Sequence, residues 1–361
     1  MTDSEFTTIA TDPEVADVRP GDELDWVKLE NYLRDVLDEE QRPGMQVKQF
    51  PHGSANLTYL VQLGDRRLVV RRPPHGTLAA GAHDMHREYR VLSKLWRSYP
   101  RAPQGLAFCD DTDVVGAPFL VIEYRTGAVI RTQFPSPMQS VPDVGHHISA
   151  AFVDAMADLH MVDPTACDLG DLGRPEGFVD RQLRGWTKRW NACRPGDADP
   201  TMDEVAALLS IDPPVPGRVS LVHSDLKLDN CQFAPDDPTR VRSVFDWDMT
   251  TLGDPLIDVG TALAYWPEHG AEGEAARALW PGQEGLGLWT RAQVRQRYAD
   301  LTGLDVHRIG WYEAFGSWKN AIALQQLANR ALHGHTTDAR LAAYADVVPI
   351  AAAHAVRLLG H

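Results

Sequence analysis

The spacing of hydrophobic residues divides the chain into two regions that predict different elements. In the first region, apolar residues recur at helical intervals between Leu24 and Leu37 and again across residues 83–96. The same region contains short stretches typical of β-strands, and Gly64 and Asp65 are expected to turn a hairpin between two of them. A first strand is expected to end near Phe50, and four more strands are expected at residues 57–63, 67–72, 105–109 and 118–124.

After Thr126 the spacing becomes that of helices. Helices are expected at residues 146–161, 178–192, 201–210, 290–303, 309–333 and 338–358. One short pair of strands, residues 219–223 and 241–246, interrupts them. The predicted fold class is therefore α+β: a small antiparallel β-sheet lobe, residues 23–125, precedes a larger, mainly helical lobe, residues 126–361, with a cleft between them.

Composition excludes several classes of protein. The 361 residues carry a formal net charge of −15, and a surface this acidic repels phosphate backbones, so we expect no nucleic-acid partner. The four cysteines form no CxxC pair, which fits reduced thiols in the cytoplasm. No signal peptide is visible and no apolar run reaches the roughly 18 residues of a membrane helix, so no membrane partner is expected. Residues 1–22 are expected to form a disordered acidic leader.

Oxygen-bearing side chains gather at the ends of the two short strands. LVHSDLKLDN places Asp225 and Asn230 after the first strand, and SVFDWD places Asp246 after the second. If the two strands pair as a hairpin, these three side chains converge at one edge. An amide oxygen and a carboxylate suit Mg²⁺, and a further carboxylate could accept a proton from an attacking hydroxyl. The set therefore predicts phosphoryl transfer rather than the turns and caps that Asp and Asn usually serve.

Other polar residues of these two segments have simpler interpretations. Asp229 and Asp248 are taken as turn or cap residues. His223 ends a strand, where a lone histidine is more often a packed, hydrogen-bonded scaffold residue than a base or a metal ligand. Lys227 could contact a transferring phosphoryl group as a point charge or could simply be solvated, and the sequence leaves both open.

The N-terminal lobe is expected to bind the nucleotide. Glu88 lies one turn before the buried stripe of its helix and has no local basic partner, so it should pair across space with Arg71, which would keep guanidinium donors for phosphates. The loop residues Ser54 and Asn56, with Thr58, could donate to a β-phosphate. The strand that ends at Glu123 and Tyr124 would connect the lobes and pair with adenine.

The motifs LVHSDLKLDN and VFDWDMTTLGDPLIDVG together resemble the aminoglycoside phosphotransferase-like kinases, whose pattern is HxDxxxxN, then acid-aromatic-acid, then GDPxxD. Two further stretches, GRPEGFVDRQLRGWTKRW and FGSWKNAIALQQLANR, resemble the subgroup fused to acyl-CoA dehydrogenase domains in animals. The resemblance implies a bilobal, protein-kinase-like fold that uses ATP and Mg²⁺. It places Asp225 on the catalytic base, with Lys227 beside it, and Asn230 and Asp246 on the metal ligands.

The resemblance also assigns supporting roles and shows two departures. Glu88 would brace the basic residue that binds phosphate, Asp258 would steady the catalytic loop, and Asp254 would be architectural. Much of the family has lysine on the third strand, where this chain has Arg71 followed by Arg72, so either arginine could contact the phosphates. A second departure is Ser224, which stands where a glycine is common and adds a Cβ to a tight loop.

Three functions from different classes follow. The first is an ATP- and Mg²⁺-dependent kinase for a small-molecule hydroxyl acceptor, with a hydroxylated acyl metabolite preferred over an aminoglycoside or other antibiotic. The second is an inactive nucleotide-binding scaffold, and the third a metal-dependent phosphohydrolase, which usually needs several His and Asp ligands around two metals. Oligomeric state is not predicted. The acceptor pocket is expected in the helical lobe, with walls from Trp186, Arg189, Trp190, Trp318 and Lys319.

Overall fold

The computed structural model describes residues 14–38, 44–51, 56–75, 84–196, 198–334 and 339–360. The chain divides into two compact units, which are described separately. Unit 1 comprises Met1–Val129, Gln232–Pro235 and Arg242–Thr250, and unit 2 comprises Ile130–Cys231, Asp236–Val241 and Thr251–His361. A single boundary along the chain does not separate the units, because two stretches from the second half belong to unit 1.

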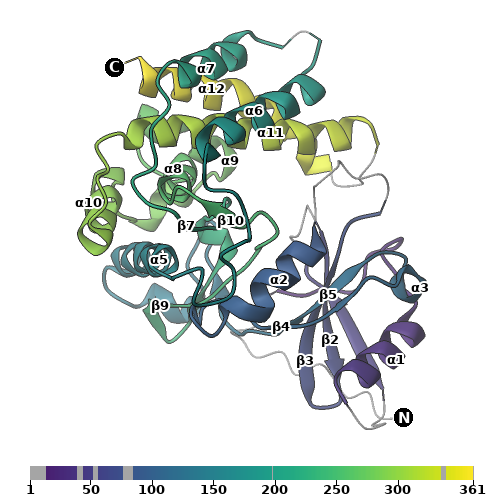
Figure 1. Ribbon diagram of the computed structural model, residues 1–361. Coiled ribbons are helices and arrows are strands. Elements are labelled where there is room, and N and C mark those ends of the chain that lie inside the picture. Colours follow the sequence, from purple (N-terminus) through teal and green to yellow (C-terminus); the bar gives the residue numbers. More distant parts are fainter. Residues whose placement is uncertain are drawn as a thin grey trace. The chain divides into compact units, whose positions relative to one another are not determined.

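Unit 1 is built on a five-stranded antiparallel sheet with the strand order β1-β2-β3-β5-β4 (Figure 1). The strands are β1 (Met45–Gln49), β2 (Leu57–Leu63), β3 (Arg66–Arg72), β4 (Gly105–Cys109) and β5 (Phe119–Glu123). Two helices pack on it, α1 (Trp26–Val36) and α2 (Met85–Leu95). These elements confirm the strands and helices that the hydrophobic spacing predicts for this part of the chain.

The two helices cover opposite faces of the sheet (Figure 1). Leu29 and Leu33 of α1 pack in one core cluster with Leu68 and Val70 of β3. Successive side chains of a strand point to opposite faces, so Arg71 points to the side where α2 packs against β4 and β5. The alternation along β3 therefore sends its two adjacent arginines to different surroundings.

The stretch Arg242–Thr250 is anchored to unit 1 by its own contacts. The backbone N–H of Val244 donates to the carbonyl of Arg101 over 2.9 Å. The ring of Trp247 is fully buried and packs edge-on against Tyr99, with 5.9 Å between ring centroids. The guanidinium of Arg87 donates to the carbonyl of Thr250 over 2.8 Å. Buried aromatic contact and backbone pairing together fix the segment that carries Asp246.

Unit 2 is mainly helical. Its longer helices are α5 (Val144–His160), α6 (Phe178–Cys193), α7 (Thr201–Ile211), α8 (Leu256–Ala264), α10 (Arg291–Thr302), α11 (Ile309–Leu332) and α12 (Val347–Leu359), and its short ones are α4 (Ser136–Gln139) and α9 (Glu274–Leu279). Helices α6, α7, α11 and α12 lie side by side (Figure 1). Helices α8 and α11 touch through their backbones, because a Cβ at Gly260 would lie 2.2 Å from the carbonyl oxygen of Tyr312 and one at Gly316 would lie 2.6 Å from that of Gly260.

The pairing of the short strands differs from the expected hairpin. β7 (Ser220–Val222) pairs with β10 (Thr251–Gly253), and β9 (Asp237–Val244) belongs to another sheet of order β6-β8-β9, with β6 (Ala128–Val129) and β8 (Cys231–Ala234). The hairpin of residues 219–223 with 241–246 is therefore wrong. The reason is that β8 is buried throughout and lies nearer in sequence, so the turn before Asp237 closes on β8.

The C-terminal segment corrects a second expectation. Residues Arg340–Leu359 form a 20-residue helical segment that is long and apolar enough to cross a membrane, although the sequence suggested no such run. One such segment is a weak indication of a membrane span, because core helices meet the same test, and α12 packs against α7 and α11. The part of the chain before α12 is a 3₁₀ helix, Ala339–Asp346, rather than the start of the continuous α-helix expected.

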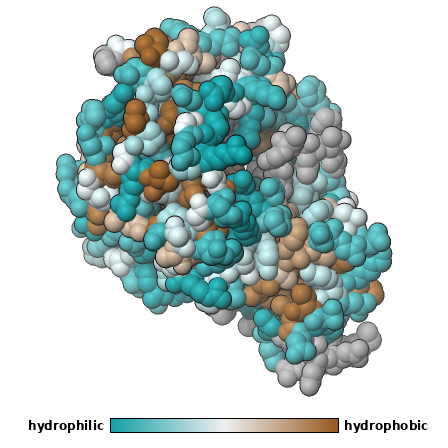
Figure 2. Space-filling model, viewed as in Figure 1, coloured by the Kyte–Doolittle hydropathy of each residue, from teal (hydrophilic) through white to brown (hydrophobic). Residues whose placement is uncertain are grey.

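Polar side chains cover most of the molecular face shown in Figure 2.

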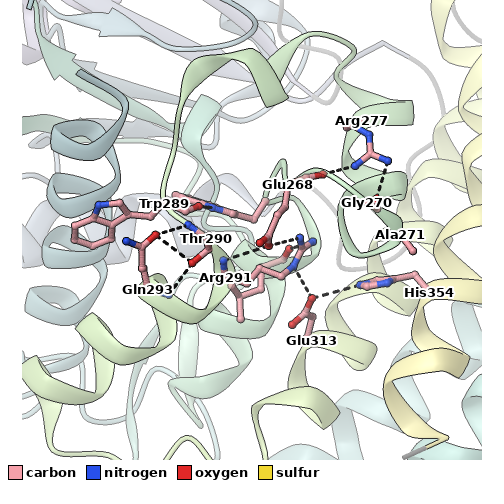
Figure 3. Close-up of polar contacts among 12 residues, drawn as sticks. Glu268, Gly270, Ala271, Arg277, Trp289, Thr290, Arg291, Gln293, Glu313 and His354 are labelled. Atoms are coloured by element: carbon pink, nitrogen blue, oxygen red, sulfur yellow. Dashed lines mark hydrogen bonds and ion pairs between the residues drawn. The ribbon is translucent and has the colours of Figure 1, made fainter. Parts of the chain in front are cut away.

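A buried group of charges joins three helices of unit 2 (Figure 3). The carboxylate of Glu313 on α11 accepts from Arg291 on α10 over 2.8 Å and from His354 on α12 over 3.3 Å. It also accepts from Arg295 on α10 over 2.5 Å. Arg291 also contacts Glu268 over 3.2 Å. Burial alone would raise the pKa of Glu313, but the hydrogen bond from His354 and the charges of Arg291 and Arg295 outweigh it and lower the pKa to about 2. Every charge in this group has an opposite partner.

Candidate active site

The loop that follows β7 is held by one buried carboxylate of unit 2. Asp258 on α8 accepts from the backbone N–H of His223 over 2.6 Å and from that of Ser224 over 2.7 Å. Burial would raise the pKa of Asp258, but hydrogen bonds from His160 and the loop outweigh it and lower the pKa. Asp258 therefore stays ionised and steadies the loop, which confirms the role that the resemblance implies.

A second layer of contacts orients that carboxylate. His160 contacts Asp258 through Nε2 over 3.1 Å, and its Nδ1 lies 2.8 Å from the hydroxyl of Tyr298. Asp254 accepts from the backbone N–H of Leu256 at the start of α8 and from the hydroxyl of Tyr312. Asp254 is thus architectural, as expected, because it holds the first residue of α8 and joins it to Tyr312 on α11.

The loop itself brings three predicted residues together. The carboxylate oxygen Oδ2 of Asp225 accepts from Nζ of Lys227 over 2.5 Å. The amide nitrogen of Asn230 donates to the carbonyl of Asp225 over 2.8 Å and lies 3.3 Å from Oδ2. Within the described residues, neither Oδ1 of Asp225 nor the amide oxygen of Asn230 has a hydrogen-bond partner. Two oxygen acceptors thus stay available beside one cation.

The remaining loop residues have defined positions. His223 is fully buried and its Nδ1 accepts from the backbone N–H of Asp225, so the scaffold interpretation of this histidine is confirmed. Ser224 has φ +70°, the left-handed conformation that glycine adopts without strain. Lys227 is paired rather than solvated: burial would lower its pKa, but Asp225, Asp229 and Tyr265 outweigh that and raise it.

Unit 1 brings together the other predicted residues. Arg71 donates to Glu88 over 2.7 Å and also to Asp246, and its guanidinium lies 4.0 Å from Asp248. Glu88 accepts a further hydrogen bond from the backbone N–H of Trp247 through Oε1. Burial raises the pKa of Glu88 to about 7, against the opposing charge of Arg71. Its other oxygen, Oε2, is buried without a hydrogen-bond partner among the described residues.

Three carboxylates surround the guanidinium of Arg71. They belong to Glu88, Asp246 and Asp248, and the last two are 29% and 13% exposed. The pKa of Arg71 rises although burial opposes this, because the carboxylates of Asp246 and Glu88 lie next to it. Sequence reasoning treated Asp248 as a turn residue and missed its proximity to Arg71.

The structure separates the two adjacent arginines. Arg72 is buried on the other face of β3, where it donates to the backbone carbonyls of Pro73 over 3.0 Å and Val115 over 2.7 Å. It contacts no carboxylate in the described part of the chain. Arg71 is therefore the arginine that meets Glu88 and Asp246.

The other predicted nucleotide contacts are only partly described. Ser54 lies outside the described residues. Asn56 is buried just before β2, and Thr58 lies in β2 opposite Arg71. The backbone N–H of Glu123 donates to Gln104, so an adenine ring could pair only with another backbone group at this position, and the ring of Tyr124 lies beside Arg67. Contact of these residues with a nucleotide stays a prediction.

The predicted site residues thus form two groups. Asp225, Lys227 and Asn230 lie together in unit 2, whereas Arg71, Glu88 and Asp246 lie together in unit 1. The convergence of Asp225, Asn230 and Asp246 at one magnesium ion stays a prediction. Among the described residues, no three His, Cys, Asp or Glu side chains are grouped to hold a metal, which leaves the phosphohydrolase hypothesis without its expected ligand cluster.

Solved structures share this fold. A candidate aminoglycoside phosphotransferase from Ralstonia eutropha matches with a TM-score of 0.73 and 28% identity, over 94% of this chain and 99% of that one. A choline kinase from Cryptosporidium parvum matches with a TM-score of 0.61 over 93% of this chain and 95% of that one, and at 12% identity it shows the fold alone. The fold is therefore the expected α+β, protein-kinase-like fold.

Sequence comparison gives the family. The model of the phosphotransferase enzyme family matches residues 46–299. Acyl-CoA dehydrogenase family member 10 of Mus musculus is 32% identical over 86% of this chain and 29% of that protein, and member 11 of Gallus gallus is 32% identical over 72% and 34%. The chain therefore spans about a third of the length of these curated relatives. The chain therefore has a protein-kinase-like fold and belongs to the phosphotransferase enzyme family.

Proposed function

We propose that this chain is an ATP- and Mg²⁺-dependent kinase that phosphorylates a hydroxyl group of a small molecule. The observation that carries the proposal is the geometry of Asp225. Its carboxylate is 19% exposed, one oxygen is held by Lys227, and the other has no described hydrogen-bond partner. A fixed carboxylate with one oxygen available is what a proton acceptor for a hydroxyl requires.

The acceptor hydroxyl transfers its proton to Oδ1 of Asp225 while its oxygen forms a bond to the γ-phosphorus of ATP. The bond between that phosphorus and the β,γ-bridging oxygen breaks, and ADP leaves with the electron pair. Lys227 stays beside Asp225 and adds positive charge next to the transferring group.

Asp246 and Asn230 are the proposed ligands of a magnesium ion. Asp246 offers a carboxylate and Asn230 offers an amide oxygen, and both are the hard oxygen ligands that Mg²⁺ prefers. When bound, Mg²⁺ would neutralise charge on the phosphates. Arg71 would contact those phosphates, braced by Glu88.

The acceptor class has support from two sides. The curated relatives are named acyl-CoA dehydrogenase family members, which favours a hydroxylated acyl metabolite. The 28% identical Ralstonia protein is described as a candidate aminoglycoside phosphotransferase, which keeps an antibiotic acceptor as the alternative. Occupied base and ligand positions disfavour an inactive scaffold.

The test compares two isosteric variants. Asp225→Asn removes the proton acceptor and leaves the unit 1 group intact, so kcat should fall about 10²–10⁴-fold while ATP binding is kept. Asp246→Asn removes a ligand of the metal, so it should weaken Mg-ATP binding itself. Phosphorus NMR with ATP, Mg²⁺ and a metabolite extract measures transfer, and titration calorimetry measures ATP binding.

A matched control is Asp237→Asn, which changes a partly exposed carboxylate at the start of β9 whose hydrogen-bond partner in the described chain is Thr239. It should leave both quantities unchanged. Wild-type turnover in Asp225→Asn, or wild-type Mg-ATP affinity in Asp246→Asn, would contradict the roles assigned here.

A further inference from the structure

Helix α11 places a buried lysine directly behind the catalytic loop. Lys319 is 3% exposed, and its ammonium group donates to the backbone carbonyl of Ser224, the residue before Asp225. Of its three possible donor hydrogens, that is the one hydrogen bond within the described chain. No carboxylate of the described residues lies at ion-pair distance from it. Lys319 is therefore a buried cation whose charge is not paired.

The neighbouring carboxylates are already committed. Burial lowers the pKa of Lys319 to about 8, although Asp225 and Asp258 oppose this. Asp225 is bound by Lys227, and Asp258 is bound by the loop and by His160. Neither carboxylate compensates the ammonium group directly. Burying an unpaired charge is costly, so such a group calls for a function or a partner that the protein alone does not supply.

A second cation lies on the same tryptophan. The guanidinium of Arg189 on α6 lies 4.4 Å from the ring centroid of Trp186, and Nζ of Lys319 lies 5.8 Å from that centroid. Burial lowers the pKa of Arg189, and no hydrogen bond or ion pair joins it to a described residue. Two cations thus lie near the buried indole of Trp186, and one of them, Lys319, contacts the residue before Asp225. They do so in a chain whose net charge is −15.

We propose that Lys319 and Arg189, which both lie close to the ring of Trp186, bind an anionic group of the acceptor, a carboxylate or a phosphate. This inference rests on the proposed kinase function, and it narrows the acceptor to a hydroxyl compound that carries negative charge. Ammonium and guanidinium groups are the side chains that recognise such anions. A bound anion would pair the buried charge, whereas a polycationic aminoglycoside would add to it.

The experiment measures binding without ATP, so it does not depend on turnover. Tryptophan fluorescence and calorimetry would compare matched probes: 3-hydroxybutyrate against 3-hydroxybutanamide for a carboxylate, glycerol 3-phosphate against glycerol for a phosphate, and choline as a cation. Wild-type protein should bind at least one anionic probe about tenfold or more tighter than its neutral partner, since a hydrogen bond to a charged group contributes about that much. Which pair shows the preference identifies the anion.

Four variants, one of them a control, show which residues cause the preference for the anion. Lys319→Met and Arg189→Met should each remove most of the preference for the anion and leave affinity for the neutral probe unchanged, and Arg189→Lys should restore part of it. Lys188→Met changes an exposed lysine of the same helix and should keep the full preference. Because Lys319 also holds the carbonyl of Ser224, the melting temperature of each variant is measured, and Arg189→Met alone carries the test if Lys319→Met unfolds.

The outcomes separate the two proposals. Equal binding of anionic and neutral probes by wild-type protein, or an unchanged preference in Arg189→Met, would overturn the anion site. Anion preference in binding without phosphate transfer to any probe or extract component counts against the kinase function and not against the anion site.

Discussion

Glu313 and Glu88 are both buried glutamates that face an arginine, yet their surroundings drive them in opposite directions. The pKa of Glu313 falls to about 2, whereas that of Glu88 rises to about 7. Glu313 has partners at both carboxylate oxygens, two of them arginines, while Glu88 shares its one arginine with Asp246 and leaves Oε2 without a described partner. Both side chains are buried, so the number of opposite charges and hydrogen-bond donors around each carboxylate decides whether its pKa falls or rises.

The two glutamates differ in how completely their described partners satisfy them. Around Glu313, positive charges and hydrogen-bond donors reach both carboxylate oxygens, and the group joins α10, α11 and α12. Around Arg71, Glu88 shares its arginine with Asp246, which is partly exposed. A buried carboxylate with few partners keeps a raised pKa, and such shifts occur more often at functional sites than elsewhere.

The largest effect is expected from Glu313→Gln. The change leaves Arg291 and Arg295 without their shared carboxylate, and removal of one partner from a buried ion pair costs about 3–5 kcal/mol. Urea unfolding measures the loss. A surface glutamate provides the control: Glu274→Gln, 3.8 Å from Arg357 and half exposed, should change stability by less than about 0.5 kcal/mol.

The same residue predicts a pH dependence. Its pKa in the folded protein is about 2, below the ordinary value of 4.5, so the unfolded chain binds the proton first as the pH falls. The stabilisation from Glu313 is therefore complete above about pH 4.5 and is lost as the pH falls towards 2. Glu313→Gln should flatten this part of the stability profile. A profile identical to that of wild-type protein would show that Glu313 is not the group responsible.

A smaller effect is expected from exchanging the arginines of β3 for lysine. Arg71→Lys keeps the charge but loses the fork that contacts Glu88 and Asp246 together, so KM for Mg-ATP should rise about 10- to 100-fold. Arg72→Lys is the matched control, because Arg72 contacts backbone carbonyls on the other face. Steady-state kinetics decides between them, and an equal rise in KM for both variants would disprove the separation of the two faces.

The smallest effect is expected from Arg295→Gln. This side chain is 30% exposed, and Glu313 keeps Arg291 and His354 after the change. The free energy of unfolding should fall by about 1 kcal/mol or less. A loss as large as that of Glu313→Gln would mean that the group depends on every partner rather than on the buried pair of Arg291 and Glu313.

Much of the fold could be predicted because its determinants are local. Helical and strand periodicity located α2, β2, β3 and β5, and the motif around Asp225 located the loop with its neighbours Lys227 and Asn230. The pairing of β7 could not be predicted in the same way. Its partner β10 has only three residues, and the paired residues, such as Ser220 and Gly253, are far apart in the sequence, so no periodic pattern indicates the pairing.

Two site properties were also beyond sequence reasoning. The sequence predicted that Glu88 pairs with Arg71 but gave no position for the adjacent Arg72. Only the tertiary structure shows that Arg72 is held by the backbone carbonyls of Pro73 and Val115 on the other face of β3. Lys319 gives no sign of burial in the sequence, where a lysine is expected to be solvated. Its burial comes from the remote residues Ser224 and Trp186, which only the tertiary structure brings to it.

The late stretch Arg242–Thr250 has a consequence for biosynthesis. The five strands of the unit 1 sheet are complete at Glu123, but the backbone N–H that Trp247 gives to Glu88 comes from a part of the chain translated much later. A ribosome needs on the order of ten seconds to reach it. During that interval Glu88 lacks the backbone donor of Trp247, and Arg71 lacks the carboxylate of Asp246. We therefore expect chaperones to bind nascent chains that are arrested before residue 250.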